Sequence, residues 1–437
     1  MKAVRVGLLG LGTVGAGTVA VLRRNADEIA RRAGRPVEIT HAAVRSLART
    51  RDCPLEGLQL TEHAESLVEH PEIDIICELI GGIEPARSLI LRAIAAGKHV
   101  VTANKALIAS HGNEIFAAAG ERGVAVSFEA AVAGGIPIIK SLREGLAGNR
   151  ITRVTGIING TSNYVLTAMA GAGRDFGEVL AEAQELGYAE ADPSFDVNGT
   201  DAAHKLTILA SIAFGMPLRY DDVYVEGIVG LSTADVAYAE ELGYRIKHLG
   251  IAALRDGRIE LRAHPTLVPQ HKLLANVDGV TNAVMVDSDA VGQSLFYGAG
   301  AGAEPTASAV IADLIDLARA LTIDADQRVP YLAFHHDRLV DIPVLDITEV
   351  ETAFYLRMRV YDRPGVLADI TRIFGDLGIS IEAVLQREPL PEHTQASIIL
   401  LTRKVREGHM YQALDQIERL PAVVGEVTRI RLDHLDD

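Results

Sequence analysis

A glycine-rich turn between an apolar strand and a helix is the feature of this sequence that most limits its fold. Residues 3–10 form a short, apolar, β-branched run that leads into GLGTVG, whose glycines are Gly10, Gly12 and Gly15. Glycines at this spacing allow a tight turn, close approach of a pyrophosphate and close helix–strand packing. An ordinary tight turn is the alternative, but the position between a strand and a helix favours nucleotide binding.

The first part of the chain alternates strands with helices. The expected elements are a helix at 13–33, strands at 37–44, 73–81 and 99–102, and a glycine-rich loop opening a long helix at 297–321. Such alternation is typical of a parallel, doubly wound α/β sheet of the Rossmann type. We therefore predict a Rossmann-type dinucleotide-binding domain at residues 1–136 together with about 305–345.

The pattern changes after Pro137. The expected elements there are a strand, a Gly-Thr-Ser-Asn turn and a helix within 150–169, helices at 178–187 and 201–214, and strands at 259–265 and 283–288. They predict an α+β domain at 137–304 with a mostly antiparallel sheet. Residues 350–437 follow a βαββαβ order, which predicts a compact ferredoxin-like module.

Composition excludes several classes of function. The formal charge of −16 argues against nucleic acid as a partner, because phosphate binding needs a basic surface. No run of 18 apolar residues and no secretory signal is present, so we expect a cytoplasmic protein without a membrane span. Cys53 and Cys77 cannot build a disulfide framework or a cysteine metal site. The histidines show no zinc-ligand spacing.

The end of the second expected strand bears on the choice of dinucleotide. Sites for NAD usually carry an acid there, whereas this sequence has Arg45, followed by Arg49 and Arg51. A guanidinium suits a 2′-phosphate, so NADP is favoured and NAD remains possible. A solvated basic turn is the alternative interpretation.

Two further segments are candidates for binding. Lys105 follows the strand at 99–102, and ligands of open sheets bind at the carboxyl ends of strands, so it could contact cofactor or substrate. A solvated loop lysine is the alternative. The stretch EAAVAGGIP at 129–137 exposes main-chain carbonyls, which suit a hard cation, or it is simply a structural turn.

Four acids precede a single lysine in GYAEADPSFDVNGTDAAHKLTIL, residues 187–209. If a helix begins near Asp201, Lys205 lies one turn further on the same face and is half-buried by the apolar residues behind it. Burial lowers the pKa of such a lysine and a nearby carboxylate raises it. Its ammonium could protonate a carbonyl oxygen as hydride arrives. A helix-stabilising ion pair worth about 0.3–0.5 kcal/mol is the alternative, and the segment alone does not decide.

Taken together, these segments resemble homoserine dehydrogenase. The matching pieces, in the family's order, are GLGTVG, TANK, EAAVAGGIP, INGTSNY, GYAEADPSFDVNGTDAAHKL and GAGAGAEPTASAV. The C-terminal module, with YDRPGVLADI at 361–370, resembles an ACT domain. The resemblance implies reversible, NAD(P)H-dependent reduction of L-aspartate 4-semialdehyde to L-homoserine, on the route to threonine, methionine and isoleucine.

The resemblance also implies roles for residues of the cleft. Lys205 would be the proton donor to the aldehyde oxygen, and Asp201 would orient it or a water beside it. Glu190 and Asp196 would hold the substrate's amino group. The remaining cleft residues would be Lys105, between nicotinamide and substrate, with Thr161 and Asn163. The implied cofactor contacts are Gly10, Gly12, Thr13, Val14, Gly15, Arg45, Lys105, Gly300, Gly302 and Glu304.

Two further sites are implied. A monovalent cation such as sodium would bind the main-chain oxygens of Glu129, Val132, Gly134 and Ile136, in a structural role. The ACT module implies feedback regulation by an amino acid, with threonine the leading candidate. Its ligand would lie near Asp362, Gly365 and Val366 between two copies of the chain, which requires a homo-oligomer, a dimer or a tetramer.

Two other functions are considered. A phosphorylating semialdehyde dehydrogenase would need a cysteine nucleophile, for which neither cysteine has an obvious base partner. An amino-acid-sensing regulatory protein could use its Rossmann unit only to bind nucleotide, but the intact acid–lysine segment argues against it. Asp192, before Pro193, is interpreted as a turn or cap residue.

Overall fold

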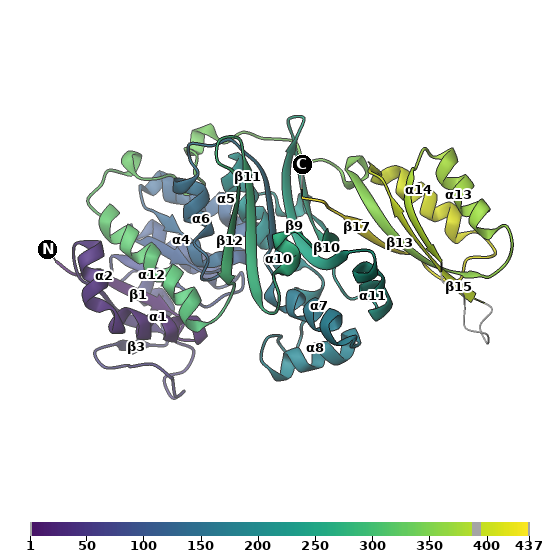
Figure 1. Ribbon diagram of the computed structural model, residues 1–437. Coiled ribbons are helices and arrows are strands. Elements are labelled where there is room, and N and C mark those ends of the chain that lie inside the picture. The colour runs from purple at the N-terminus through teal and green to yellow at the C-terminus, as the bar shows by residue number, and fades with distance from the viewer. Residues whose placement is uncertain (1, 387–394, 436–437) are drawn as a thin grey trace.

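Three parts of the chain follow one another along the molecule (Figure 1). The computed structural model describes residues 2–386 and 395–435. The Rossmann part contains the N-terminus at one end, a central part carries the longest strands, and the C-terminal module lies at the other end. Within the described residues, no helix combines the length and apolar character needed to cross a membrane.

The first sheet has six parallel strands in the order β3-β2-β1-β4-β5-β6, so the predicted doubly wound α/β sheet is confirmed. Its strands are β1 (Val4–Leu9), β2 (Val37–Ala43), β3 (Gln59–Thr61), β4 (Ile75–Glu78), β5 (His99–Thr102) and β6 (Val126–Ser127). Its helices are α1 (Thr13–Arg24), α2 (Ala26–Ala33), α3 (Ala64–Val68), α4 (Ala86–Ala95), α5 (Lys105–Arg122) and α12 (Ala303–Ala320). The sheet order reverses beside β1, where dinucleotide folds bind their ligand.

Several expected boundaries differ from those in the structure. The helix expected at 13–33 is interrupted at Asn25, a weak helix former whose backbone leaves the helical region. The strand expected at 73–81 stops at Glu78, because Gly81 and Gly82 adopt positive φ angles of 71° and 74°. Residues 297–299, expected in a loop, belong to strand β12.

Helix α12 returns late in the chain to pack beside α1. A Cβ atom on Gly17 of α1 would lie 2.6 Å from the main-chain oxygen of Ala303, so the two backbones touch and no side chain fits between them. This contact brings the turn before α12 next to the glycine turn before α1.

The second sheet spans the central part and the C-terminal module. Its order is β12 (Gly292–Ala299), β11 (Thr281–Ser288), β7 (Ile151–Ile157), β9 (Tyr244–Arg255), β10 (Arg258–Pro269), β17 (Thr428–Leu432), β13 (Glu351–Tyr361), β15 (Gln395–Thr402) and β14 (Ile381–Gln386). The two modules are joined by a short parallel pairing of β10 with β17. The sequence did not predict this continuity.

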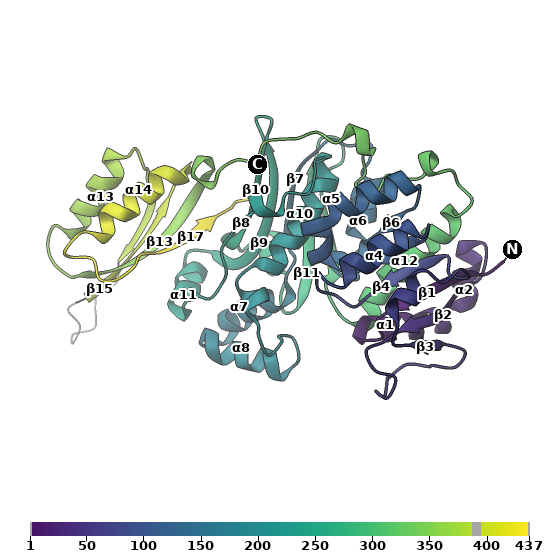
Figure 2. The ribbon, with the colours of Figure 1, turned by 180° about the vertical axis from the view of Figure 1, so that it is seen from behind.

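Helices cover both faces of the C-terminal sheet. On one face lie α13 (Val366–Asp376) and α14 (Glu407–Glu418), which complete the predicted βαββαβ module (Figure 2). The other face packs against the central helices α7 (Gly160–Ala172) and α11 (Thr233–Glu241). The remaining central helices are α6 (Ile138–Lys140), α8 (Phe176–Glu185), α9 (Ser194–Val197) and α10 (Thr200–Phe214).

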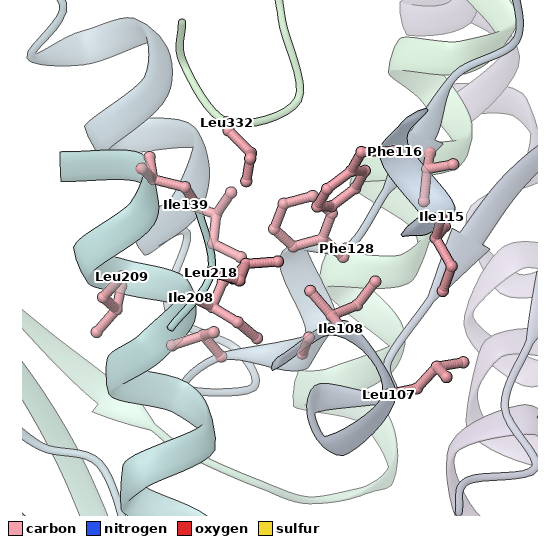
Figure 3. Close-up of a cluster of buried hydrophobic side chains, with 14 of the residues drawn as sticks. Leu107, Ile108, Ile115, Phe116, Phe128, Ile139, Ile208, Leu209, Leu218 and Leu332 are labelled. Atoms are coloured by element: carbon pink, nitrogen blue, oxygen red, sulfur yellow. The ribbon is translucent and has the colours of Figure 1, made fainter. Parts of the chain in front are cut away.

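A shared apolar core joins the Rossmann and central parts and positions the site. Leu107 and Ile108 of α5 lie in the same buried cluster as Ile208 and Leu209 of α10 (Figure 3). Each such side chain contributes about 1.5–3 kcal/mol by leaving water. The packing of α5 on α10 brings Lys105, at the start of α5, to the turn of α10 that carries Asp201 and Lys205.

Candidate active site

A cavity of about 650 Å³ lies where the Rossmann and central parts meet. It is lined by Lys105, Asn159, Gly160, Thr161, Gly187, Tyr188, Ala189, Glu190, Asp196, Asp201, Lys205, Val280, Thr281, Asn282, Tyr297, Gly298, Ala299, Gly300, Ala301 and Gly302. Its size suits a small substrate together with the reactive end of a larger cofactor. Most of the side chains expected to act on a substrate therefore line one cavity.

Asp201 is the centre of this cavity. Its Oδ2 lies 2.7 Å from Nζ of Lys205, and its Oδ1 lies 3.1 Å from Nζ of Lys105. Burial alone would raise the pKa of Asp201, but the two ammonium groups outweigh burial and hold that pKa well below its usual range. One ionised carboxylate thus holds two lysines that come from different parts of the fold.

Lys205 is placed as an acid. The predicted one-turn spacing from Asp201 is present, but the side chain is buried rather than half-buried, with 8% of the residue exposed. Nζ also donates to the main-chain oxygen of Ile158 at 2.6 Å. An ammonium has three protons, so one remains for a ligand. Burial lowers the pKa of Lys205, and Asp201 offsets only part of that effect, so the proton is easier to give away.

Lys105 differs from Lys205 in its electrostatics. Burial lowers its pKa, but attraction to Asp201, Asp196 and Glu190 outweighs burial, so the pKa is raised overall. Its Nζ lies 5.7 Å from the centre of the Phe195 ring. Lys105 therefore keeps its charge at neutral pH, which suits attraction of an anionic or developing negative group rather than proton transfer.

His204 precedes Lys205 and could be mistaken for the acid. Burial lowers the pKa of His204 to about 4, so the ring is neutral near pH 7. The ring stacks on Tyr220 with centroids 4.3 Å apart. A neutral, stacked imidazole packs the back of the site, which leaves proton transfer to the lysine.

Asn159 is a site residue that the sequence did not predict. Its Nδ2 donates to Asp196 at 2.7 Å and to Asp201 at 2.8 Å. Its Oδ1 accepts from the Ser162 N–H at 2.7 Å, so Asn159 also caps α7. The Gly-Thr-Ser-Asn segment is thus the first turn of α7 and not a turn before it. An asparagine directly before a helix start was the available signal.

The acids expected to hold an ammonium group have different surroundings. Asp196 is partly buried, and burial raises its pKa, while the Asn159 bond lowers it. Glu190 is exposed at the mouth of the cavity. Thr161 donates from Oγ1 to the main-chain oxygen of Tyr188 at 2.7 Å and so holds the segment that carries Glu190. Asp192 accepts from the Ser194 N–H at 3.1 Å, as expected of a turn residue.

Asn163 and Glu304 have partners other than those expected. Asn163 lies outside the cavity lining, because its Nδ2 is directed to the main-chain oxygens of residues 277, 279 and 281 at 3.0, 2.9 and 3.3 Å. It supports the cavity wall from behind. Glu304 also lies outside the lining and pairs with Arg24 of α1 at 2.7 Å. Gly300 and Gly302, in contrast, line the cavity.

The glycine turn has the geometry that a dinucleotide needs. Gly10 has a φ of 96°, which favours glycine, and a Cβ on Gly15 would lie 2.2 Å from the Gly10 oxygen. A Cβ on Gly12 would meet nothing within 4 Å, so the space beside Gly12 is open to a ligand. Thr13 and Val14 begin α1 directly after this turn. These features fit a pyrophosphate held at a helix N-terminus.

Arg45 lies in the loop after β2, exposed to solvent. Its loop follows the strand that pairs with β1, at the carboxyl edge of the sheet. In the same loop, Arg51 donates to the main-chain oxygen of Arg49 at 2.7 Å. A guanidinium at this edge is compatible with the 2′-phosphate of a dinucleotide ribose.

The loop at residues 129–137 contains two consecutive residues with positive φ angles. Ala133 and Gly134 have positive φ angles of 55° and 49°, an uncommon conformation for alanine that is often found at functional sites. Of the four expected cation ligands, Glu129 and Ile136 use their main-chain oxygens to accept from Val132 and Ile138 at 3.4 and 2.8 Å. Main-chain oxygens are ligands that hard cations accept. Among the described residues, no cluster of His, Cys, Asp or Glu could hold a metal ion.

The expected effector loop belongs to the C-terminal module. Asp362 is exposed, Gly365 caps α13 with a φ of 97°, and Val366 begins that helix.

The cysteines lie outside the catalytic cavity lining. Cys77 is buried in β4, and burial raises its pKa well above the usual value, which disfavours a thiolate nucleophile.

Comparison with known proteins agrees with this geometry. Residues 137–315 match the family described as homoserine dehydrogenase, residues 10–129 its NAD-binding domain, and residues 354–422 the ACT domain. The chain is 56% identical to homoserine dehydrogenase of Pseudomonas aeruginosa, with 100% of both chains covered.

Solved structures are similar over the same length. The crystal structure of a homoserine dehydrogenase from Thiobacillus denitrificans is 60% identical, with a TM-score of 0.94 and 99% of both chains covered. A hyperthermophilic archaeal homoserine dehydrogenase in complex with NADPH is 26% identical, with a TM-score of 0.61, covering 74% of this chain and 100% of its own. The chain therefore belongs to the homoserine dehydrogenase family, an NAD(P)-dependent oxidoreductase family, and carries a C-terminal ACT domain.

Proposed function

We propose that the cavity reduces L-aspartate 4-semialdehyde reversibly to L-homoserine, with Lys205 as the proton donor. The observation that supports this most is the buried Asp201 carboxylate bridging Lys205 at 2.7 Å and Lys105 at 3.1 Å. A buried ammonium with a lowered pKa and one unused proton suits protonation of a developing alkoxide.

Lys205, Lys105 and Asp201 have separate roles in this reaction. When bound, the nicotinamide cofactor supplies the hydride, so the protein needs neither a covalent nucleophile nor a metal for that step. Lys205 gives its proton to the aldehyde oxygen as negative charge develops there. Lys105, which keeps its charge, stabilises the same negative charge. Asp201 fixes both ammonium groups and is a positioning residue.

The substrate's ammonium would be held by two further carboxylates of the cavity. Asp196 and Glu190 both line the cavity, and Asn159 fixes Asp196 by a 2.7 Å hydrogen bond. The same Asn159 bonds Asp201, so it couples the ammonium-binding wall to the acid. The cavity thus offers carboxylates for the ammonium of a zwitterionic aldehyde and lysines for its aldehyde oxygen.

Replacement of Lys205 by alanine tests the assignment. We expect Lys205→Ala to lose at least about 100-fold in kcat, the low end for general acid catalysis, with the Kd for NADPH unchanged. Lys247→Ala is the matched control, because Lys247 is also buried and paired with an acid, Asp278 at 3.0 Å, but does not line the catalytic cavity. Near-normal turnover of Lys205→Ala would show that another group is the acid.

The proposed cofactor is NADP, on the basis of the exposed Arg45 guanidinium at the edge of β2. The archaeal relative's complex with NADPH supports the same choice. Arg45→Gln should raise the KM for NADPH about 10-fold and leave that for NADH unchanged. Equal effects on both cofactors would remove Arg45 from the site.

A monovalent cation is proposed to bind the loop at 129–137 through the main-chain oxygens of Glu129, Val132, Gly134 and Ile136. The loop also supports the cofactor side of the cavity, because a Cβ on Gly134 would lie 2.4 Å from the Gly300 oxygen. The cation would therefore stabilise the wall formed by Gly300. Replacing sodium and potassium by a bulky organic cation should lower the melting temperature.

Regulation by threonine is proposed to act through the ACT domain, with its ligand near Asp362, Gly365 and Val366 and between two copies of the chain. Hydrogen bonds that link the ACT domain to the segment carrying Asp196 support this proposal. Arg431 of β17 donates to Glu226 at 2.7 Å. Two residues after Glu226, the Ile228 N–H donates to the main-chain oxygen of Val197 at 2.8 Å. Val197 follows Asp196, so movement of the ACT domain could shift that acid. Activity assays with and without threonine test the regulation, and sedimentation tests whether two copies of the chain associate.

A further inference from the structure

Asn282 is buried in the cavity wall, and its side-chain amide has no hydrogen-bond partner among the described residues. It lies in β11, and 1% of the residue is exposed. Within the described part of the chain, neither Oδ1 nor Nδ2 has a partner, although the residue lines the catalytic cavity. Buried amides are normally paired, because an unpaired polar group is costly to take out of water. A ligand atom in the cavity is the partner that would remove this cost.

The neighbours of Asn282 define which part of the amide is unused. A Cβ on Gly300 would lie 2.1, 2.2 and 2.3 Å from Cγ, Nδ2 and Oδ1, so the face of the amide lies flat against Gly300. A Cβ on Gly160 would lie 3.7 Å from Oδ1. The face is therefore covered by Gly300, and the edge that carries one acceptor and two donors is the unpaired part.

We propose that Asn282 binds the carboxamide of the nicotinamide ring, an inference that rests on the proposed dehydrogenase function. A carboxamide offers an acceptor and a donor side by side and pairs with both atoms of the asparagine edge. In the proposed reaction the substrate's ammonium is held by Asp196 and Glu190. The groups that remain on the substrate, its carboxylate and aldehyde, only accept hydrogen bonds and would leave Oδ1 of Asn282 unpaired. Gly300, against which the amide lies, precedes α12, and the start of α12 packs on α1 just after the glycine turn. Asn282 therefore lies on the side of the cavity that faces the proposed dinucleotide site.

This contact would fix the orientation of the ring. Hydrogen bonds from Asn282 to the carboxamide would restrain rotation of the nicotinamide about its glycosidic bond, and so would limit which ring face can meet the substrate. Asn282 would then select both the cofactor's carboxamide and the face that gives up hydride. Its role is binding and orientation rather than proton transfer.

Replacement of Asn282 by leucine, which is similar in size and apolar, tests this role by calorimetry. The probes are NADP⁺, its 3-acetylpyridine analogue, which lacks the N–H donors, and 2′-phospho-ADP-ribose, which lacks the ring. We expect the wild type to bind NADP⁺ about 10-fold more tightly than the acetylpyridine analogue, as for one lost buried hydrogen bond. In Asn282→Leu this ratio should fall to about 1, with affinity for 2′-phospho-ADP-ribose unchanged.

Two controls keep the outcomes apart. Thr281→Val changes the neighbouring lining residue and should leave the ratio as in the wild type. The ligand-free Asn282→Leu protein should melt at the same or a higher temperature, because its unpaired amide is gone; if it does not fold, Asn282→Ala replaces it. If the ratio of the two affinities is unchanged in Asn282→Leu, whether or not the Kd for homoserine is raised, this inference is overturned and the proposed function is not. Absence of NADP⁺ binding by the wild type overturns the proposed function as well.

Discussion

At the scale of single residues, buried charge arranges the catalytic site. Asp201 accepts from Lys205 and Asn159 and also faces Lys105, so its charge is fully compensated. The two lysines then differ in acidity because Lys205 is the more deeply buried. A single carboxylate thereby produces one lysine that can release its proton and one that retains it.

A second buried acid gives a pH-dependent contribution to stability. Burial raises the pKa of Glu129 from 4.5 to about 7, although its carboxylate accepts from the Ile139 and Lys140 N–H groups. The folded state therefore binds this proton more tightly than the unfolded state. Protonation of Glu129 therefore contributes roughly 3 kcal/mol to the free energy of unfolding. This contribution is complete below pH 4.5 and is lost as the pH rises through about 7.

We expect Glu129→Gln to remove this part of the pH dependence. Compared with the wild type, the variant should gain relative stability between pH 5 and pH 8, measured by urea unfolding at both pH values. Glu38→Gln, at an exposed position, serves as the control and should behave as the wild type. A wild-type-like pH dependence in Glu129→Gln would contradict the raised pKa.

At the scale of elements, two glycines of one turn are required for different reasons. Gly15 has no room for a side chain, because its Cβ would lie 2.2 Å from the Gly10 oxygen, whereas the space beside Gly12 is open. The first is required by helix–strand packing and the second by the ligand. Separate substitutions should therefore have separable effects.

Alanine at each position tests this distinction. Gly12→Ala should fold with the melting temperature of the wild type and bind NADPH at least about 10-fold more weakly, since its methyl group enters the pyrophosphate space. Gly15→Ala should lower the melting temperature by several degrees, because the strand and helix must separate. Equal NADPH affinity in Gly12→Ala and the wild type would show that the cofactor does not approach this turn.

Local sequence patterns predicted the elements better than the contacts between them. The one-turn spacing of Asp201 and Lys205 and the glycine turn depend on neighbours in sequence, so they could be predicted. The link from Asp201 to Lys105, the bridging by Asn159 and the true position of Asn163 depend on packing of distant segments. No periodicity in the sequence records that α5 meets α10, or that β10 pairs with β17.

At the scale of the whole molecule, a buried ion-pair network joins the ACT domain to the catalytic domain. Arg431 has 0% of its surface exposed and bonds Glu407 at 2.5 and 2.7 Å and Glu226 at 2.7 Å. It lies on β17, the strand that pairs with β10 of the central part. The two domains are thus joined by main-chain pairing and by charge at the same place.

Removal of Arg431 should therefore destabilise the molecule strongly. We expect Arg431→Met to lower the free energy of unfolding by about 3–5 kcal/mol, because it leaves Glu407 buried without its cation. Arg258→Met is the matched control, since the exposed Arg258–Glu349 pair should contribute less than about 1 kcal/mol. Urea unfolding measures both variants. Equal losses in the free energy of unfolding would show that the buried network contributes no more than an exposed ion pair.

The pH dependence of kcat for homoserine oxidation, compared between the wild type and Asp201→Asn, tests the central claim most directly. In this direction Lys205 must be neutral to accept the proton, so kcat should rise with pH through the pKa of Lys205. Asparagine removes the carboxylate that raises this pKa, so the rising limb should move to lower pH. A limb at the same pH in both proteins would contradict the assignment of Lys205 as the acid set by Asp201.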